Sequence, residues 1–501
     1  MKFIKKIFNR FTIIALLVIL QILFFVGLFY YLEVYFVVAQ FVFALLGILI
    51  LFTFNFKSMH VEAKLTWSLI IILFPFLGIP CYLLFSKNLP SRKHKKLYKE
   101  LFISKSKKSN DHLRKLIEDK YYGQMEYLLK VNNQQAYSNT KTVFFKDGES
   151  FFNDLLVELS KAKKFIFMEY FIIEEGLMFE SILKILQDKV SQGVEVKLMY
   201  DDIGTINYLP SNFNKLINKL GIECVKFNPF IPIVSAIHNN RDHRKITIID
   251  GKVAYTGGIN IGDEYINEEE KFGHWKDTAV KLEGPAVDGF TEMFLKLFIL
   301  QKGKDFSTDQ YYNHHQSFTT NGIVVPIEDG PSPLSPEYVA ENVYLNTINQ
   351  AEKELLITTP YLICDSKLMT ALENAASRGV NVKIFTPHIP DKKIIFQITR
   401  SNYTRLISKG IQIFEYTPGF LHSKQILADQ KVGIVGTINF DYRSLVHHFE
   451  DGIWMYNTEC LKQIKNDFTE LEKISQNMKD FKQNKMMYIF CKSLEIFYPL
   501  L

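Results

Sequence analysis

The part of the chain after residue 142 carries one sequence pattern twice. Residues 162–173 (AKKFIFMEYFII) have a counterpart in residues 351–363 (AEKELLITTPYLI), and both are typical of a helix end that leads into a buried strand. Two more pairs follow at nearly the same separation: GVEVKLMY at 193 with GVNVKIFT at 379, and GIEC at 221 with GIQI at 410. Such regular spacing indicates the duplication of a whole folding unit.

Each copy alternates short apolar, β-rich runs with amphipathic stretches, which predicts an α/β sheet packed between helices. A proline-dense stretch at residues 324–336 marks the connection between the copies. We therefore predict two tandem α/β/α sandwich domains, residues 136–322 and residues 323–501. They are expected to form an internal pseudo-dimer with a cleft along its pseudo-two-fold axis.

The N-terminal 86 residues predict a membrane anchor. Residues 11–32 and 34–56 contain no charge, and each run exceeds the roughly 20 residues that cross a bilayer core. We expect these two runs to span the membrane as a hairpin. A third run, residues 65–85, contains Pro75 and Pro80, so it is expected to be re-entrant or interfacial, with a third span as the alternative.

Residues 87–135 are predicted to form a basic juxtamembrane linker. Glu100 is the one acid among nine basic residues between 87 and 108, which favours contact with anionic headgroups on the inner face of the membrane; a solvated linker is the alternative. The basic residues are Lys87, Arg92, Lys93, Lys95, Lys96, Lys99, Lys105, Lys107 and Lys108.

The five cysteines of the chain are scattered along the sequence and are expected to be reduced.

A polar motif of the form H-x-K-x-x-x-x-D occurs once in each copy. In a strand of period two, the histidine and the lysine project from the same face and can address one anion. A lone histidine is more often structural, but the duplication favours a shared site. The predicted catalytic residues are His243, Lys245 and Asp250 in the first copy and His422, Lys424 and Asp429 in the second.

Two histidines and two lysines at one site suit phosphodiester chemistry. The lysines hold the phosphate oxygens, one imidazole attacks and the other protonates the leaving oxygen, with no metal or cofactor expected. These residues do not decide which histidine attacks. Asp250 and Asp429 either take part or support the loop. Asn260, Asn439 and Thr437 are predicted to bind phosphate, and Asp277 and Glu450 to orient the histidines, with ordinary surface carboxylates as the alternative for the last two.

The paired motifs resemble the phospholipase D superfamily, and further segments resemble bacterial cardiolipin synthases. The resemblance implies two phospholipase D-like domains preceded by transmembrane helices in a multi-pass protein of the bacterial cell membrane. The basic juxtamembrane cluster predicts that the catalytic domains face the cytoplasm. It implies that two phosphatidylglycerols give cardiolipin and glycerol, with His243 as the phosphohistidine and His422 as acid, then base. The segments are NRDHRK at 240, GGINIGDEY at 257, EGPAV at 283, TPY at 359, EYTPGF at 415 and PLL at 499.

Other functions stay open beside this one. A phospholipase D hydrolase or a phosphatidylserine-type synthase would use the same residues, and a membrane scaffold would not need them. A nuclease is disfavoured because no basic and aromatic stripe for nucleic acid is evident. Protein partners are not indicated. Residues 229–233 (PFIPI) are a candidate lipid-facing lip, with a buried loop as the alternative.

Overall fold

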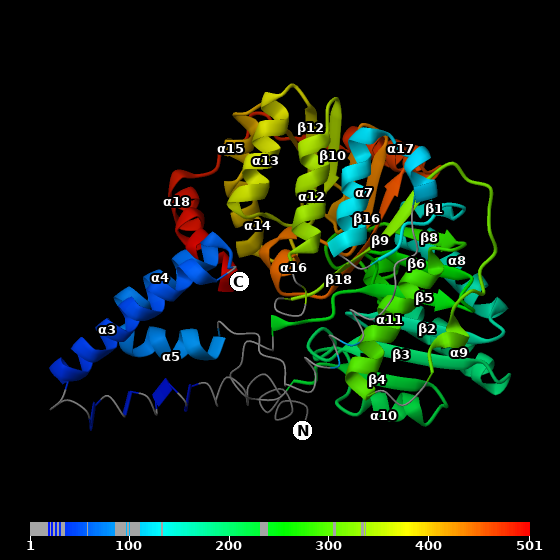
Figure 1. The fold of residues 1–501 in the computed structure, drawn as a ribbon, viewed down its shortest axis with the longest axis horizontal. Helices are drawn as coiled ribbons and strands as arrows, with labels where there is room; N and C mark the ends of the chain where they lie inside the picture. The colour runs from blue at the N-terminus through cyan, green and yellow to red at the C-terminus, as the bar shows by residue number, and fades with distance from the viewer. Residues whose placement is uncertain are drawn as a thin grey trace. The chain divides into compact units, whose positions relative to one another are not determined.

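The computed structural model describes residues 36–57, 59–85, 111–131, 134–230, 239–303, 307–331, 335 and 337–500, with isolated residues between 19 and 31 and at 97 and 100. The chain forms two compact units (Figure 1). The first unit consists of residues 1–89, 230–238 and 495–501. The second unit consists of residues 90–229 and 239–494 and contains both copies of the repeated pattern.

The first half of the second unit is built on a seven-stranded sheet of order β1-β8-β6-β5-β2-β3-β4, in which β2, β3 and β4 are parallel and the other pairings are antiparallel. The strands are β1 (Lys141–Phe145), β2 (Phe165–Tyr170), β3 (Glu195–Asp201), β4 (Glu223–Phe227), β5 (Lys245–Ile249), β6 (Val253–Gly257) and β8 (Ala279–Glu283). The helices are α8 (Gly148–Lys161), α9 (Leu177–Ser191), α10 (Phe213–Asn218) and α11 (Val287–Lys302).

The second half repeats this order in an eight-stranded sheet, β19-β13-β12-β10-β15-β16-β18-β9, with β19 added at one edge. Its strands are β9 (Ile323–Asp329), β10 (Glu354–Thr358), β12 (Asn381–Pro387), β13 (Gln412–Tyr416), β15 (Gln425–Ala428), β16 (Val432–Gly436), β18 (Glu450–Tyr456) and β19 (Ser475–Asn477). Its helices are α12 (Val339–Gln350), α13 (Ser366–Ser377), α14 (Lys393–Ser401), α15 (Tyr403–Ile407), α16 (Tyr442–Val446), α17 (Cys460–Lys473) and α18 (Lys485–Leu494). The prediction of two tandem α/β domains is confirmed.

Local sequence explains why equivalent elements form in both halves. Strand β2 (FIFMEY) is apolar apart from Glu169 and wholly buried, and strand β10 (ELLIT) has three central apolar residues and is buried after Glu354, as strands covered on both faces require. Aspartate caps begin two helices at different places in the repeat, α8 before β2 and α13 after β10: Asp147 accepts from the Ser150 amide at 2.9 Å, and Asp365 accepts from the Leu368 amide at 3.0 Å.

The two halves share one hydrophobic core. On the first side, the ring of Phe294 in α11 stacks on Phe167 of β2 with centroids 4.8 Å apart. On the second side, Phe385 of β12 packs against Phe468 of α17 at 5.6 Å. All four side chains belong to a single buried cluster that runs through both halves, so the halves pack as one body and meet where the site lies.

Helix α7 (Asp119–Val131) corrects the predicted linker 87–135, because it is part of the packed second unit. Its Gln124 side chain is buried, accepts from Trp454 Nε1 at 2.9 Å and donates to Gln350 Oε1 at 2.7 Å. The end of this basic region therefore folds onto the second half. The basic cluster at 87–108 lies outside the described residues apart from residues 97 and 100.

The first unit contains α3 (Phe36–Thr53), α4 (Val61–Leu73), α5 (Pro75–Phe85) and the 3-10 turn η7 (Glu495–Leu500). The predicted run 65–85 is not one continuous helix. It breaks at Phe74, which precedes a proline and has φ −134° and ψ 64°. The predicted span 11–32 lies largely outside the described residues. Within the described part of the chain, no helix combines the length and the apolar character needed to cross a bilayer.

Candidate active site

Two further short strands complete the site: β7 (His274–Lys276) and β14 (Gly419–Leu421), which pair in parallel between the two halves. Each predicted site histidine stands just before a strand and is fixed by the backbone of the other half. The His243 amide donates to the Phe449 carbonyl at 2.9 Å, and the His422 amide donates to the Lys276 carbonyl at 2.7 Å. Neither half therefore positions its histidine alone.

The carboxylates are exchanged between the halves. His243 Nδ1 lies 3.0 Å and 2.9 Å from the two oxygens of Glu450 in the second half, and His422 Nδ1 lies 2.6 Å from Asp277 Oδ2 in the first half. Both carboxylates are fully buried. When Nδ1 carries the proton, this hydrogen bond fixes the tautomer and leaves the Nε2 lone pair of each ring available for chemistry.

The two lysines are buried beside the histidines. Lys245 Nζ donates to the carbonyl of His243 at 2.6 Å, and Lys424 Nζ donates to the carbonyl of His422. Burial lowers the pKa of Lys245 to about 8 and that of Lys424 to about 7. The charge of Lys245 also lowers the pKa of Lys424 and of His422, so the two motifs belong to one electrostatic site.

Burial lowers the pKa of His243 to about 3 and that of His422 to about 4, although Glu450 and Asp277 oppose this shift. Burial acts to raise the pKa of the Glu450 carboxyl, but the hydrogen bond of His243, and its positive charge when the ring is protonated, outweigh burial, and the pKa falls. Both imidazoles are thus neutral near pH 7. An acid–base scheme with one cationic ring needs an anion nearby, and a bound phosphodiester would raise the pKa of the ring beside it.

Asp250 and Asp429, predicted with the catalytic residues, lie beyond the far ends of β5 and β15 from the histidines. Asp250 accepts from the backbone amides of residues 163, 164 and 165 at 2.7–3.1 Å. Asp429 accepts from the amides of residues 352, 353 and 354 at 2.8–3.3 Å. Both aspartates have positive φ, 54° and 51°, in tight turns. Their contacts favour the loop-support alternative.

The predicted phosphate ligands have different surroundings. Asn260 Oδ1 accepts from the Ile172 amide at 3.0 Å, and its Nδ2 donates to the Tyr265 hydroxyl at 2.7 Å. Asn439 is buried, and its Oδ1 has no hydrogen-bond partner among the described residues. The Thr437 hydroxyl donates to Glu450, so it holds the carboxylate that orients His243. A phosphate contact of Thr437 stays a prediction.

Aromatic rings and a third histidine surround the dyads and were not among the predicted residues. The His422 ring packs against Trp275 at 5.2 Å and Phe420 at 5.8 Å, and the His243 ring packs against Phe171 at 5.1 Å and His448 at 5.4 Å. Trp275 and His448 could have been found in the sequence, because each stands two residues before a predicted orienting carboxylate.

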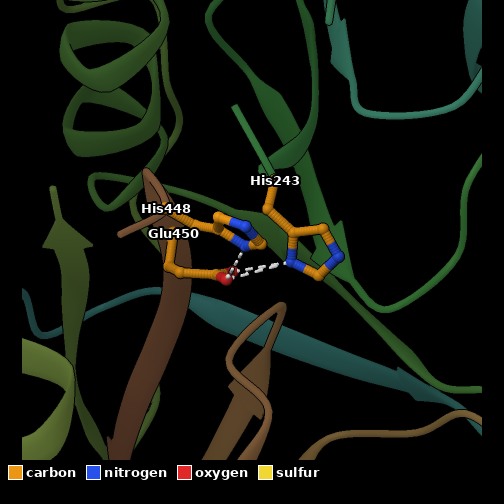
Figure 2. A group of neighbouring side chains, drawn as sticks. All are labelled: His243, His448 and Glu450. Atoms are coloured by element: carbon orange, nitrogen blue, oxygen red, sulfur yellow. Dashed lines mark hydrogen bonds and ion pairs between the residues drawn. The ribbon is translucent and has the colours of Figure 1, made fainter. Parts of the chain in front are cut away.

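His243, His448 and Glu450 place their donor atoms within 4.8 Å of one another. Figure 2 shows both imidazoles pointing a nitrogen at the Glu450 carboxylate. Glu450 hydrogen bonds to His243 at 2.9 Å, whereas His448 Nδ1 lies 3.5 Å from Glu450 Oε1 at ion-pair distance and has no hydrogen-bond partner among the described residues.

Comparisons with known proteins identify relatives of this chain. The family described as "Cardiolipin synthase, PLD-like domain" matches residues 155–283 and 344–472, one segment in each half. An uncharacterized protein of Streptococcus mutans is 45% identical over 84% of this chain and 92% of its own length. A cardiolipin synthase of Clostridium perfringens is 34% identical over 80% of this chain and 86% of its own length.

Among solved structures, the phosphatidylserine synthase of Haemophilus influenzae covers 76% of this chain and 100% of its own, with a TM-score of 0.57 and 14% sequence identity. At this identity the likeness concerns the fold alone. The family match in both halves and the length of the shared sequence are decisive: this chain belongs to the cardiolipin synthase family of proteins with phospholipase D-like domains.

Proposed function

We propose that this protein is a cardiolipin synthase, a phosphatidyltransferase that converts two phosphatidylglycerols into cardiolipin and glycerol. The observation that carries the proposal is the exchange of carboxylates: His243 pairs with Glu450, and His422 pairs with Asp277, each across the boundary between the halves. Together with two buried lysines at the same site, these pairs supply a nucleophile, an acid–base group and charge for a phosphate.

In the proposed first step, Nε2 of His243 attacks the phosphorus of one phosphatidylglycerol. The bond from phosphorus to the glycerol oxygen breaks, and His422 gives its proton to that oxygen, so that free glycerol leaves. In the second step, the neutral His422 takes the proton from a hydroxyl of a second phosphatidylglycerol. That oxygen attacks the phosphohistidine, the P–N bond breaks and cardiolipin is released. One phosphodiester replaces another, so no nucleotide energy is needed.

Lys245 and Lys424 would neutralise the phosphate oxygens in both steps. A phosphodiester carries one negative charge and its transition state concentrates more on the equatorial oxygens, where a buried ammonium acts strongly. The unpaired amide oxygen of Asn439 marks a further polar group that substrate can engage, because buried polar atoms are normally paired.

Transfer to a lipid instead of water requires a site with little water. The rings of Phe171, Tyr265, Trp275 and Phe420 around the two histidines supply apolar walls, and both histidines are at least nine-tenths buried. Because both substrates are membrane lipids, the proposed place of action is the cell membrane, with the second unit on the cytoplasmic side. Residues 231–233 of the suggested lipid-facing lip lie outside the described residues.

Incubation of the purified full chain with phosphatidylglycerol labelled in the headgroup glycerol and the phosphate tests this proposal. We expect labelled cardiolipin and free labelled glycerol in equal amounts. The matched control is the double variant His243→Ala, His422→Ala, which should give neither. Phosphatidic acid without cardiolipin would establish a hydrolase instead. A serine-dependent product would establish a phosphatidylserine-type synthase.

A further inference from the structure

Trp275 and His448 hold equivalent places in the two halves. Each lies two residues before the carboxylate that pairs with a site histidine, Trp275 before Asp277 and His448 before Glu450. Each ring also packs against the histidine of that pair, at 5.2 Å from His422 for Trp275 and at 5.4 Å from His243 for His448. The pseudo-two-fold arrangement therefore sets an indole beside one pair and a third imidazole beside the other.

The imidazole makes a contact that the indole does not. His448 Nδ1 lies 3.5 Å from Glu450 Oε1, the oxygen that is also 3.0 Å from His243 Nδ1 (Figure 2). The side chain of His448 is 12% exposed, whereas Glu450 is fully buried. Neither His448 Nδ1 nor Trp275 Nε1 has a hydrogen-bond partner in the described part of the chain, so the 3.5 Å approach of His448 to Glu450 is an ion-pair contact of the protonated ring. The Glu450 carboxylate thus lies between two imidazoles.

His448 acts on the pKa of both members of the pair. Burial acts to raise the pKa of Glu450, and His243 followed by His448 outweighs that effect, so the carboxylate stays ionised. Burial is the main reason for the low pKa of His243, Glu450 opposes it, and Lys245 and then His448 lower it further. The charge of Glu450 in turn acts to raise the pKa of two further groups, Lys424 and Asp329.

The geometry points to His448 as a positioning residue for phosphatidyl transfer, one that holds the ionised Glu450 carboxylate against His243 and suits His243 to the nucleophilic role. This inference rests on the proposed function. When Nε2 of His243 attacks phosphorus, the ring acquires positive charge, and a fixed carboxylate on Nδ1 stabilises that charge. Among the residues that the structure describes, no second imidazole contacts the pair of His422 and Asp277, so the structural difference between the pairs becomes a difference of role.

The test compares His448→Phe with His448→Asn in the full chain, using phosphatidylglycerol in mixed micelles. Phenylalanine keeps a ring of similar size and removes the nitrogen, whereas the asparagine amide keeps an N–H donor near the position of Nδ1 without a titrating charge. His447→Asn, one residue away, is the matched control for loss of a histidine. Thermal unfolding of each variant monitors folding.

We expect His448→Phe to lower kcat about tenfold with KM within about twofold, because the imidazole contact that holds the Glu450 carboxylate is lost in the transition state. His448→Asn should recover most of kcat. In both variants the acid limb of kcat/KM should move to higher pH, because a positive charge that lowers the pKa of His243 is gone. His447→Asn should keep the wild-type profile.

Equal activity of the wild type and His448→Phe, with the same pH profile, would overturn the inference. So would an asparagine variant that is as impaired as the phenylalanine variant, since the ring would then only fill space. A wild type that makes no cardiolipin would reject the proposed function itself, and the inference with it. If the wild type makes cardiolipin and replacement of His448 changes neither its rate nor its pH profile, this inference alone would be rejected.

Discussion

The two halves of the second unit share a strand order and an exchanged carboxylate, but they differ in what surrounds each carboxylate. Glu450 accepts from His243 with both oxygens and from Thr437. Asp277 has Gly258 in the corresponding turn, and a Cβ atom at that glycine would lie 2.1 Å from Asp277 Oδ1. In the second half the orienting carboxylate is the longer Glu450, and the Thr437 hydroxyl donates to it. In the first half the carboxylate is the shorter Asp277, and Gly258, which has no side-chain donor, lies beside it.

This difference teaches that duplication preserved the architecture of the site but not the equivalence of its two histidines. Exchange of the carboxylates makes each half incomplete alone. The different neighbours then allow one ring to act as nucleophile and the other as acid and base. Four predictions test that comparison.

The largest effect is expected from the histidines themselves. His243→Ala or His422→Ala should each lower the rate of cardiolipin formation by on the order of 10³-fold, because each step needs both rings. The rate of cardiolipin formation by the double variant should be close to that of the slower single variant, because residues that act as a unit give non-additive losses of rate. Steady-state rates of lipid product formation provide the measurement. Losses that multiply in the double variant would indicate two independent sites.

The exchanged carboxylates come next. Glu450→Gln and Asp277→Asn should each reduce kcat by on the order of 10²-fold, because the amide no longer holds the correct tautomer or stabilises the charged ring. In a His422→Ala background, Glu450→Gln should still slow formation of the phosphohistidine, whereas Asp277→Asn should not change it further. Rapid-quench measurement of the labelled adduct separates the two. If Asp277→Asn slowed formation of the phosphohistidine and Glu450→Gln did not, His243 would pair with Asp277 of its own half instead of with Glu450.

Lys424 links activity to stability. Its folded pKa of about 7 lies below the unfolded value of about 10.4, so the unfolded state binds more protons between these values and wild-type stability rises with pH across that window. Lys424→Met should reduce this slope, to which Lys245 also contributes, and raise the free energy of unfolding below pH 7 by about 2 kcal/mol. It should also lower kcat by on the order of 10²-fold. Unfolding curves in detergent from pH 6 to 10 provide the measurement, and an unchanged slope would contradict the burial of this charge.

The smallest effect on activity is expected at the two motif aspartates. Asp250→Ala should cost about 3 kcal/mol of stability, because three backbone amides lose their acceptor. In the fraction that folds, kcat/KM should change less than about threefold. Asp429→Ala is the matched variant in the other half. A large loss of kcat in variants that are as stable as the wild type would show that Asp250 and Asp429 take part in catalysis.

Much of the site's architecture could be predicted from the sequence, because duplication and strand periodicity are local signals. The pattern H-x-K in each copy placed His243 and Lys245 together, and the helix–strand alternation predicted both sheets. The partner of each carboxylate could not be predicted. Asp277 follows His243 in the chain but hydrogen bonds to His422, because the exchange depends on how two domains pack.

Helix α7 could not be predicted, because its local composition favours a linker and only its packing reveals a helix. Its sequence, DKYYGQMEYLLKV, mixes charged and polar residues with apolar ones and follows a basic stretch, so its composition favours a linker. Packing decides otherwise, since Tyr121, Met125 and Leu128 are buried against the second half. The role of Asp250 depends likewise on hydrogen bonds to amides that are distant in the chain, such as that of Lys164. The role of Thr437 depends on its hydrogen bond to Glu450 in β18.

The most direct test of the central claim uses a phosphatidyl ester of p-nitrophenol, a leaving group that needs no general acid. With His422→Ala, we predict a burst of one nitrophenol per chain and an alkali-stable, acid-labile phosphoryl label on the peptide that contains His243. The double variant His243→Ala, His422→Ala should give neither burst nor label. A label on any other residue, or a burst that survives in the double variant, would contradict the account.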